Sequence, residues 1–189
     1  MKRGLLIVVS GPSGVGKDTL IKRLLELDPN LTYSISGTTR EPRPGEIPDE
    51  NYTFLTREQF EDLVKQGAFL EHAVYNGNLY GTFHDRVERA RREGRDVVLK
   101  IEVQGAEQVK QRVPDALRIF IGPPSWNELA KRQEERGSGT KSDRNARLEI
   151  AEKEMTYAPG YDHLVINDDV ERAAHELLEI IRKARERQT

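Results

Sequence analysis

The chain has 189 residues, which is the size of one domain or of one domain with insertions. Its 30 Lys and Arg residues against 32 Asp and Glu residues give a net charge of −2, whereas a general nucleic-acid binder is usually strongly basic. It has no cysteine, which excludes disulfides, thiolate metal sites and a cysteine nucleophile, and no apolar run approaches the roughly 20 residues of a membrane helix. We therefore expect a protein that binds neither nucleic acid nor membrane. The lack of cysteine also fits a reducing compartment, so we expect the protein in the cytoplasm.

Four short apolar runs predict buried strands. Each run is continuous rather than alternating, which is typical of parallel strands that are covered on both faces; the runs are residues 5–9, 97–101, 117–121 and 163–166. Helical patterns lie between or after them, at residues 17–27, 125–136, 144–156 and 170–187. Strands that alternate with helices predict an α/β fold with a mainly parallel sheet and flanking helices.

Two regions interrupt this alternation. Residues 37–81 contain a Pro- and Gly-rich loop, a short helix opened by Thr56, and an Asn76-Gly77 pair typical of a hairpin turn, so they predict a small mixed α/β insertion. Residues 137–143 are polar and turn-rich and predict a loop within a lid region at about 125–156. The remainder, about 1–36, 82–124 and 157–189, would form the core of one domain.

The clearest motif follows the first strand directly. It has the glycine and lysine spacing of a P-loop, in which backbone N–H groups and a helix N-terminus bind phosphate oxygens; its residues are Gly11, Pro12, Ser13, Gly14, Val15, Gly16, Lys17, Asp18 and Thr19. We expect these residues to bind the phosphates of a nucleotide, with Lys17 adding a positive charge on the outer phosphates, and a P-loop alone leaves a motor, a switch, a transporter or a kinase open. A strict P-loop has Ser or Thr after the lysine, and here that position is Asp18. Asp18 and Thr19 are therefore the candidate Mg²⁺ residues, with helix capping as the alternative role for Asp18.

Arg40 and Arg43 lie three residues apart in the Pro-rich loop. Prolines stiffen such a loop, and guanidinium groups bind phosphate through paired hydrogen bonds. The sequence closely resembles the guanylate kinase family over nearly its whole length. The resemblance rests on the P-loop, residues 36–46, Tyr52-x-Phe54, 69–71, 80–82, 103–105, 121–125, Arg132-x-x-x-Arg136-Gly137 and Asn167-Asp168.

The resemblance implies an enzyme of guanine nucleotide metabolism that transfers the γ-phosphoryl of ATP to GMP, and also to dGMP, with Mg²⁺. It implies that Arg40, Arg43, Tyr52 and Tyr80 hold the GMP phosphate, and that Ser36, Glu71 and Thr82 read the guanine. Guanine offers two neighbouring N–H donors that one carboxylate can accept, and adenine lacks that pair, so a carboxylate at Glu71 suits GMP. At the predicted strand 97–101 the family has two acids two positions apart; here Glu102 keeps the second and Lys100 replaces the first. The resemblance implies that Glu102 contacts either the guanine amine or the water shell of the metal.

The resemblance places three more arginines at the transferred phosphoryl group: Arg132, Arg136 and Arg147. Arg132 and Arg136 are four residues apart and hence on one helix face. Together with Lys17 and Arg40 they would neutralise charge during in-line transfer, and the acceptor phosphate needs no strong base because it is already an anion. Two other functions stay open from the residues alone: a kinase for another monophosphate, and a non-catalytic module that binds a phosphorylated ligand at the GMP site.

Overall fold

The structure is a computed structural model that describes residues 2–136 and 141–188, without the side chains of residues 136 and 141–144. The chain divides into two compact units: unit 1 holds Met1–Ile7 and Thr32–Ala116, and unit 2 holds Val8–Leu31 and Leu117–Thr189. Each unit is described by itself. Within the described ranges, no helix is long and apolar enough to cross a membrane.

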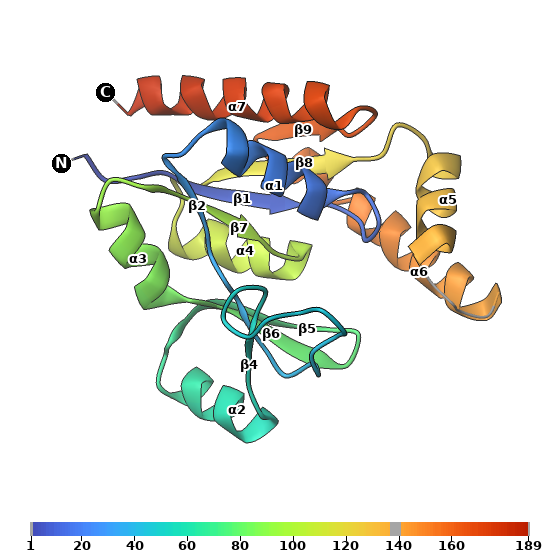
Figure 1. Ribbon diagram of the computed structural model, residues 1–189, viewed down its shortest axis with the longest axis horizontal. Coiled ribbons are helices and arrows are strands. Elements are labelled where there is room, and N and C mark those ends of the chain that lie inside the picture. Colours follow the sequence, from blue (N-terminus) through green and yellow to red (C-terminus); the bar gives the residue numbers. More distant parts are fainter. Residues whose placement is uncertain (1, 137–140, 189) are drawn as a thin grey trace. The chain divides into compact units, whose positions relative to one another are not determined.

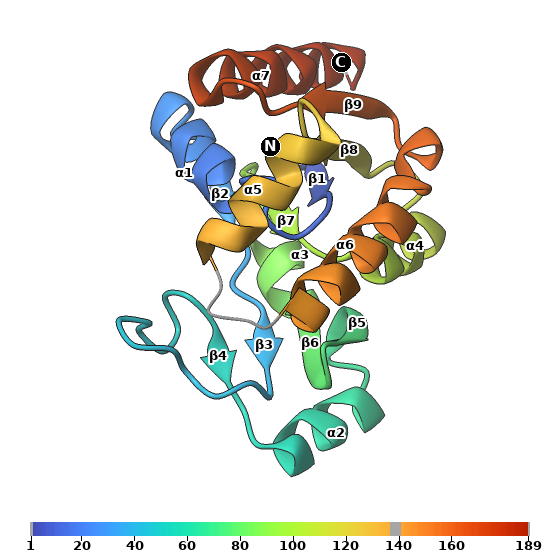
Figure 2. The same ribbon diagram turned by 90° about the vertical axis from the view of Figure 1, so that its right-hand side faces the viewer.

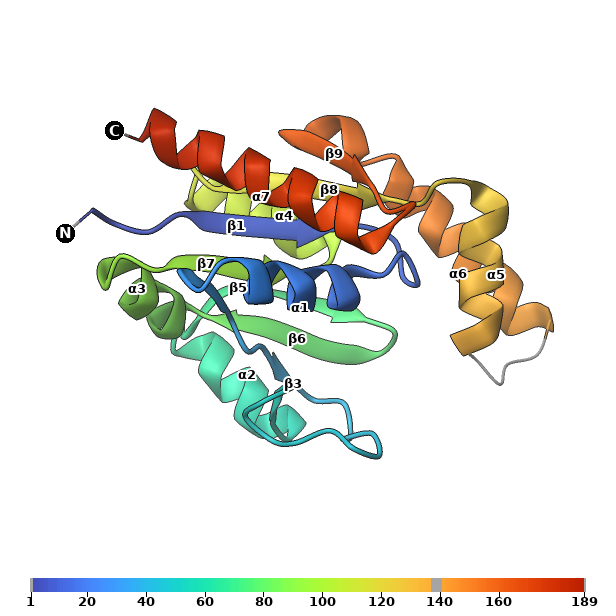
Figure 3. The same ribbon diagram turned by 45° about the horizontal axis from the view of Figure 1, so that its top comes forward.

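Unit 2 begins inside the first strand and contains the glycine-rich motif. Its elements in chain order are the end of β1 (Leu6–Ser10), α1 (Lys17–Leu27), β8 (Leu117–Gly122), α5 (Trp126–Arg136), α6 (Lys141–Met155), β9 (His163–Ile166) and α7 (Val170–Arg187). Strands β8 and β9 pair in parallel, with Ile121 opposite Val165. Figure 3 shows α5 and α6 side by side after β8.

Helix α7 closes the core of unit 2. Asp169 caps its N-terminus by accepting the Arg172 N–H at 2.9 Å, and buried residues such as Ala173, Leu177 and Ile181 recur at helical spacing. This face packs against α1 and β9, as Figure 1 shows. The packing fixes α1, and with it the glycine-rich turn that precedes α1.

Unit 1 carries a second sheet. Its elements are β2 (Leu31–Tyr33), β3 (Gly37–Thr38), β4 (Thr53–Phe54), α2 (Arg57–Lys65), β5 (Phe69–Tyr75), β6 (Asn78–Phe83), α3 (His84–Arg92), β7 (Asp96–Lys100) and α4 (Val103–Arg112). Strands β5 and β6 form an antiparallel hairpin whose turn residues, Asn76 and Gly77, both have positive φ, as the Asn-Gly pair predicts. Thr56 caps α2 in the predicted way, with a complete capping box to Gln59. Figure 2 shows this sheet with α2 beside it.

The described strands form a five-stranded sheet in the order β2-β7-β1-β8-β9 and a four-stranded sheet in the order β4-β3-β6-β5. The α/β class with a parallel sheet and flanking helices is therefore confirmed. In the smaller sheet β3 pairs in parallel with β4 and antiparallel with β6.

Two details of the sequence prediction are wrong. The strand at residues 163–166 is not covered on both faces: Leu164 is 49% exposed, whereas its neighbour Val165 is fully buried, so only one face of β9 packs into the core. The loop predicted at residues 137–143 ends earlier, because α6 already begins at Lys141; residues 137–140 lie outside the described chain. Ser and Asp are common in the first turn of a helix as well as in loops, which explains this error.

Candidate functional site

Residues 11–16, called here the glycine loop, connect β1 to α1 and need glycine at two positions for steric reasons. Gly11 has φ +149° and Gly16, the N-cap of α1, has φ +98°. A Cβ atom would lie 2.3 Å from the Ile121 carbonyl oxygen at the first position and 2.5 Å from Asn167 Nδ2 at the second. The loop can therefore hold this conformation against β8 and the segment after β9 only because both side chains are absent.

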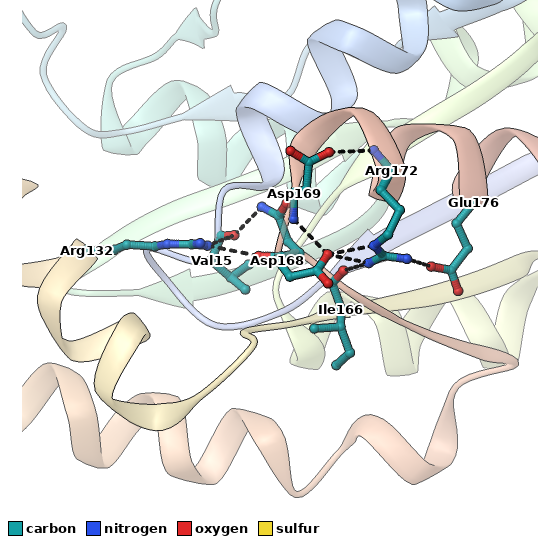
Figure 4. Close-up of polar contacts among 8 residues, drawn as sticks. Val15, Arg132, Ile166, Asp168, Asp169, Arg172 and Glu176 are labelled. Carbon is teal, nitrogen blue, oxygen red and sulfur yellow. Dashed lines mark hydrogen bonds and ion pairs between the residues drawn. The ribbon is translucent and has the colours of Figure 1, made fainter.

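Side chains from two other elements of unit 2 hold the carbonyl groups of the glycine loop. Gln133 Nε2 donates to the Ser13 carbonyl at 2.7 Å, and Asn167 Nδ2 donates to the Val15 carbonyl at 2.7 Å. Arg132 Nη1 also reaches Val15, at 3.4 Å, as Figure 4 shows. Because donors occupy these carbonyls, the loop can offer its N–H groups to an anion.

Lys17 and the start of α1 add to this anion site. Lys17 Nζ donates to the carbonyls of Gly11 and Pro12 and is thereby folded over the loop. The first hydrogen bond within α1 runs from Leu20 N–H to Gly16 O, so the amides before Leu20 have no acceptor inside the helix. A helix N-terminus next to a lysine favours binding of phosphate.

Asp18 and Thr19 lie exposed in the first turn of α1, beside the glycine loop. Within residues 2–136 and 141–188, no group of three or more His, Cys, Asp or Glu side chains is placed to hold a metal ion. Mg²⁺ commonly takes one or two protein oxygens and completes its shell with phosphate and water. One carboxylate and one hydroxyl at this turn fit a metal that arrives with a nucleotide.

Among the three candidate lid arginines, Arg132 is the one whose side-chain contacts can be described in detail. It donates to Glu128 at 3.1 Å and to the Asn167 carbonyl at 3.2 Å, in addition to Val15. Arg147 is exposed on α6. Arg136 ends α5, and its side chain lies outside the description.

Next to Asn167, Asp168 forms an ion pair with Arg172, which also pairs with Glu176 (Figure 4). The Arg172 side chain and the Asp169 amide lower the pKa of Asp168. This network is exposed and supports the start of α7.

Unit 1 holds the second group of candidate residues, and Arg40 is its most connected member. Arg40 makes a bidentate ion pair with Glu46, at 2.8 and 3.0 Å, and its guanidinium lies 5.3 Å from the centre of the Tyr52 ring. This ion pair raises the pKa of Arg40 and lowers the pKa of Glu46. A hydrogen bond with Tyr80 adds to the raised pKa of Arg40. The rings of Tyr52 and Tyr80 lie 6.0 Å apart, so three of the residues predicted to hold the GMP phosphate come together.

The register of the smaller sheet connects this cluster to Glu71. Tyr80 and Thr82 are two residues apart on β6 and therefore share a face. Glu71 lies opposite Thr82 and accepts a hydrogen bond from its hydroxyl at 2.5 Å. Glu71 is only 3% exposed, and this burial raises the pKa of its carboxyl to about 7. A buried carboxyl of this kind sits on the same sheet face as the arginine–tyrosine cluster.

The remaining predicted residues of unit 1 are placed as follows. Ser36 is buried beside β3, and its backbone carbonyl accepts the Thr53 N–H at 2.9 Å; Arg43 has an exposed side chain. Glu102 is the N-cap of α4, and its charge contributes to the raised pKa of Glu71. Lys100, whose surroundings the sequence does not define, has its ammonium 5.7 Å from the centre of the Tyr52 ring.

Sequence reasoning assigned no role to Gly105 or Arg112. A Cβ at Gly105 would lie 2.2 Å from Glu71 Oε2, so the glycine in α4 leaves the space that the carboxyl fills. Arg112, at the end of α4, donates to the Phe69 and Leu70 carbonyls at 3.1 and 2.5 Å, and its charge opposes the rise of the Glu71 pKa. An isolated glycine inside a helical segment is the sequence signal for such a close approach.

Comparisons with known proteins agree with this arrangement. A family model described as guanylate kinase matches residues 3–184. A guanylate kinase from Rubrobacter xylanophilus is 49% identical over 183 residues, covering 97% of this chain and 96% of the relative. One from Desulfitobacterium hafniense is 47% identical over 178 residues, covering 94% and 89%. The crystal structure of guanylate kinase from Anaplasma phagocytophilum has a TM-score of 0.81 at 33% identity and covers 96% of this chain and 86% of that chain.

Proposed function

Because the chain belongs to the guanylate kinase family, we propose that it transfers the γ-phosphoryl group of ATP to GMP, and to dGMP, and releases ADP and GDP or dGDP. The observation that carries the choice of GMP is the buried Glu71 carboxyl, which shares a sheet face with Tyr80 and Thr82. As a carboxylate it accepts both N1–H and the exocyclic amine of guanine. With adenine the buried carboxylate would keep its hydrogen bond from Thr82 but lose both donors of the base, which is costly.

Unit 2 would bind ATP. The loop amides and the α1 N-terminus hold its phosphates, and Lys17 exchanges its contacts with loop carbonyls for the outer phosphates. Asp18 and Thr19 would hold Mg²⁺ directly or through water. When bound, Mg²⁺ neutralises charge on the ATP phosphates and helps to align them.

Unit 1 would bind GMP. Arg40, Arg43, Tyr52 and Tyr80 hold its phosphate, and Ser36, Glu71, Thr82 and Glu102 contact the guanine. The clustering of Arg40 with both tyrosines supports the first set, and the hydrogen bond between Thr82 and Glu71 supports the second.

Transfer itself requires alignment and charge neutralisation rather than a base, because the acceptor is a phosphate oxygen. Arg132 uses three N–H donors on Glu128, Val15 and Asn167, and its remaining donors would contact the transferred group. Arg136 and Arg147 would add positive charge. We place this reaction in the cytoplasm and in guanine nucleotide metabolism.

The test is phosphoryl transfer from ATP to GMP, dGMP, AMP and UMP, with and without Mg²⁺. We expect Mg²⁺-dependent transfer to GMP and dGMP, with AMP and UMP far behind. Preference for AMP would refute the assignment of Glu71 to the base. A chain that binds GMP but neither binds ATP nor transfers phosphate would instead be a phospholigand-binding module.

A further inference from the structure

Contacts with Glu41 and Glu46 hold one defined part of the Arg40 guanidinium. Nη1 donates to the Glu41 backbone carbonyl at 2.7 Å and to Glu46 Oε2 at 3.0 Å, and Nη2 donates to Glu46 Oε1 at 2.8 Å. A guanidinium has five N–H donors in a fixed planar fork. These contacts therefore use both donors of Nη1 and one of Nη2.

The donors outside these contacts are Nε–H and the second N–H of Nη2. They lie on one edge of the guanidinium and point the same way, which is the geometry of a bidentate arginine–phosphate pair. The Tyr80 hydroxyl also interacts with this guanidinium. Glu46 thus takes the end of the fork, and a phosphate at the side of the fork would meet Arg40 together with Tyr80, which is itself predicted to hold the GMP phosphate.

Glu46 is itself fixed by the backbone of its loop. Its carboxylate accepts the Arg43 N–H at 2.7 Å, and its own N–H donates to the Arg43 carbonyl at 3.0 Å. Pro42 and Pro44 on either side of Arg43 restrict this turn. The pair is mostly screened from water, since the side chains of Arg40 and Glu46 are 14% and 19% exposed. The carboxylate is therefore an anchored partner and not a mobile surface charge.

We propose that Glu46 is a positioning residue for GMP, which orients Arg40 so that its Nε–Nη2 edge receives the GMP phosphate; this inference rests on the proposed function. It assigns to Glu46 an indirect role, through Arg40, that differs from direct phosphate binding. A lone arginine on this loop would keep its rotamer freedom and lose part of that freedom at each binding event. The alternative is that Glu46 competes with the GMP phosphate for Arg40. In that case removing the charge of Glu46 would tighten GMP binding.

The experiment compares Glu46→Gln with Glu41→Gln in the full-length chain. Both substitutions remove one negative charge from the same loop, but Glu41 touches Arg40 only through its backbone carbonyl. For Glu46→Gln we expect the KM for GMP to rise about tenfold to a hundredfold, because a charge-assisted pair is lost, while the KM for ATP and kcat at saturating GMP change less than threefold. For Glu41→Gln we expect all three constants to stay within twofold of the wild type.

A double mutant tests whether Glu46 acts through Arg40. In an Arg40→Ala background, Glu46→Gln should add less than twofold to the KM for GMP, because the group that it positions is gone. Thermal unfolding and the KM for ATP monitor folding of each variant. An unchanged KM for GMP, a lowered one, or a full additional loss in the Arg40→Ala background would each overturn the inference. Absence of GMP phosphorylation by the wild type would instead refute the proposed function.

Discussion

The buried carboxyl of Glu71 makes a quantitative prediction about pH. Guanine requires the ionised form, because a carboxylate accepts from both of its N–H groups, whereas a protonated carboxyl must donate one hydrogen. Desolvation raises the pKa of Glu71 to about 7, more than the Thr82 hydroxyl and Arg112 lower it. GMP binding should therefore weaken as the pH falls through neutrality.

The size of this effect follows from the ionised fraction of Glu71. With a pKa of about 7, the carboxyl is about nine-tenths ionised at pH 8 and about one-tenth ionised at pH 6. The KM for GMP should accordingly rise about tenfold between pH 8 and pH 6 through this group alone. The KM for ATP contains no contribution from Glu71 and should lack this component.

The assay is steady-state transfer from ATP to GMP from pH 5.5 to 8.5, with Glu71→Gln as the control. The control is needed because a phosphate monoester such as GMP itself titrates near pH 6, with a pKa of roughly 6. The variant keeps that titration and lacks the titration of Glu71. The KM for GMP of Glu71→Gln should exceed the wild-type value by about tenfold to a hundredfold at pH 8. The ratio of the variant KM to the wild-type KM should be about tenfold smaller at pH 6, because the wild type has then lost its carboxylate as well. A ratio that stays constant across this range would refute the reasoning.

Three further predictions concern stability, the space that Gly105 leaves for Glu71, and the metal. Because the pKa of Glu71 is raised to about 7 in the folded chain, the folded state keeps a proton that the unfolded state releases above about pH 4.5. The free energy of unfolding should therefore fall by about 3 kcal/mol as the pH rises from 4.5 to 7. Denaturant titrations should show this fall reduced in Glu71→Gln. In Gly105→Ala the new Cβ displaces the Glu71 carboxyl, so the KM for GMP should rise about tenfold or more without a change in the KM for ATP. The control is Gly160→Ala, where the Cβ meets open space, and this variant should match the wild type in a parallel assay. Asp18→Ser restores the hydroxyl of a strict P-loop and should keep activity while shifting its Mg²⁺ dependence; a folded but inactive variant in an Mg²⁺ titration would contradict the metal assignment.

The sequence predicts the elements whose signals are local. A continuous apolar run, a glycine turn and an amphipathic segment predict β1, the glycine loop and α1, and the structure has α1 at Lys17–Leu27 as expected. The Thr56 capping box and the Asn76-Gly77 turn are likewise complete signals within four residues. Such patterns are reliable because they depend on neighbours in the chain.

Helix α3 was not predicted, because its buried face lacks an apolar pattern. One of its three buried residues is Arg91, which is 2% exposed and donates from Nε to the Gly4 carbonyl at 2.9 Å. A buried arginine with a distant backbone partner reads in the sequence as a surface charge. Helix α4 was missed for a related reason, because Gly105 weakens its helical signal while making space for Glu71.

In the candidate site, too, local sequence predicts some features, and others depend on contacts between distant residues. The residue types for phosphate and guanine recognition are visible in the sequence, but their partners are not. Glu46 looks like an exposed loop acid, and only the turn closed by Arg43 brings it to Arg40. The contact between Gly105 and Glu71 joins residues on different elements, and the raised pKa of Glu71 follows from burial that no local pattern encodes.

The central claim is that unit 2 binds ATP and unit 1 binds GMP through separate sets of residues. Calorimetric titration of each nucleotide into Lys17→Ala and Arg40→Ala tests it most directly. We expect Lys17→Ala to lose ATP affinity and keep GMP affinity within about threefold, and Arg40→Ala to show the reverse. Loss of both nucleotides in either folded variant, or competition between GMP and ATP for one site in the wild type, would contradict the claim.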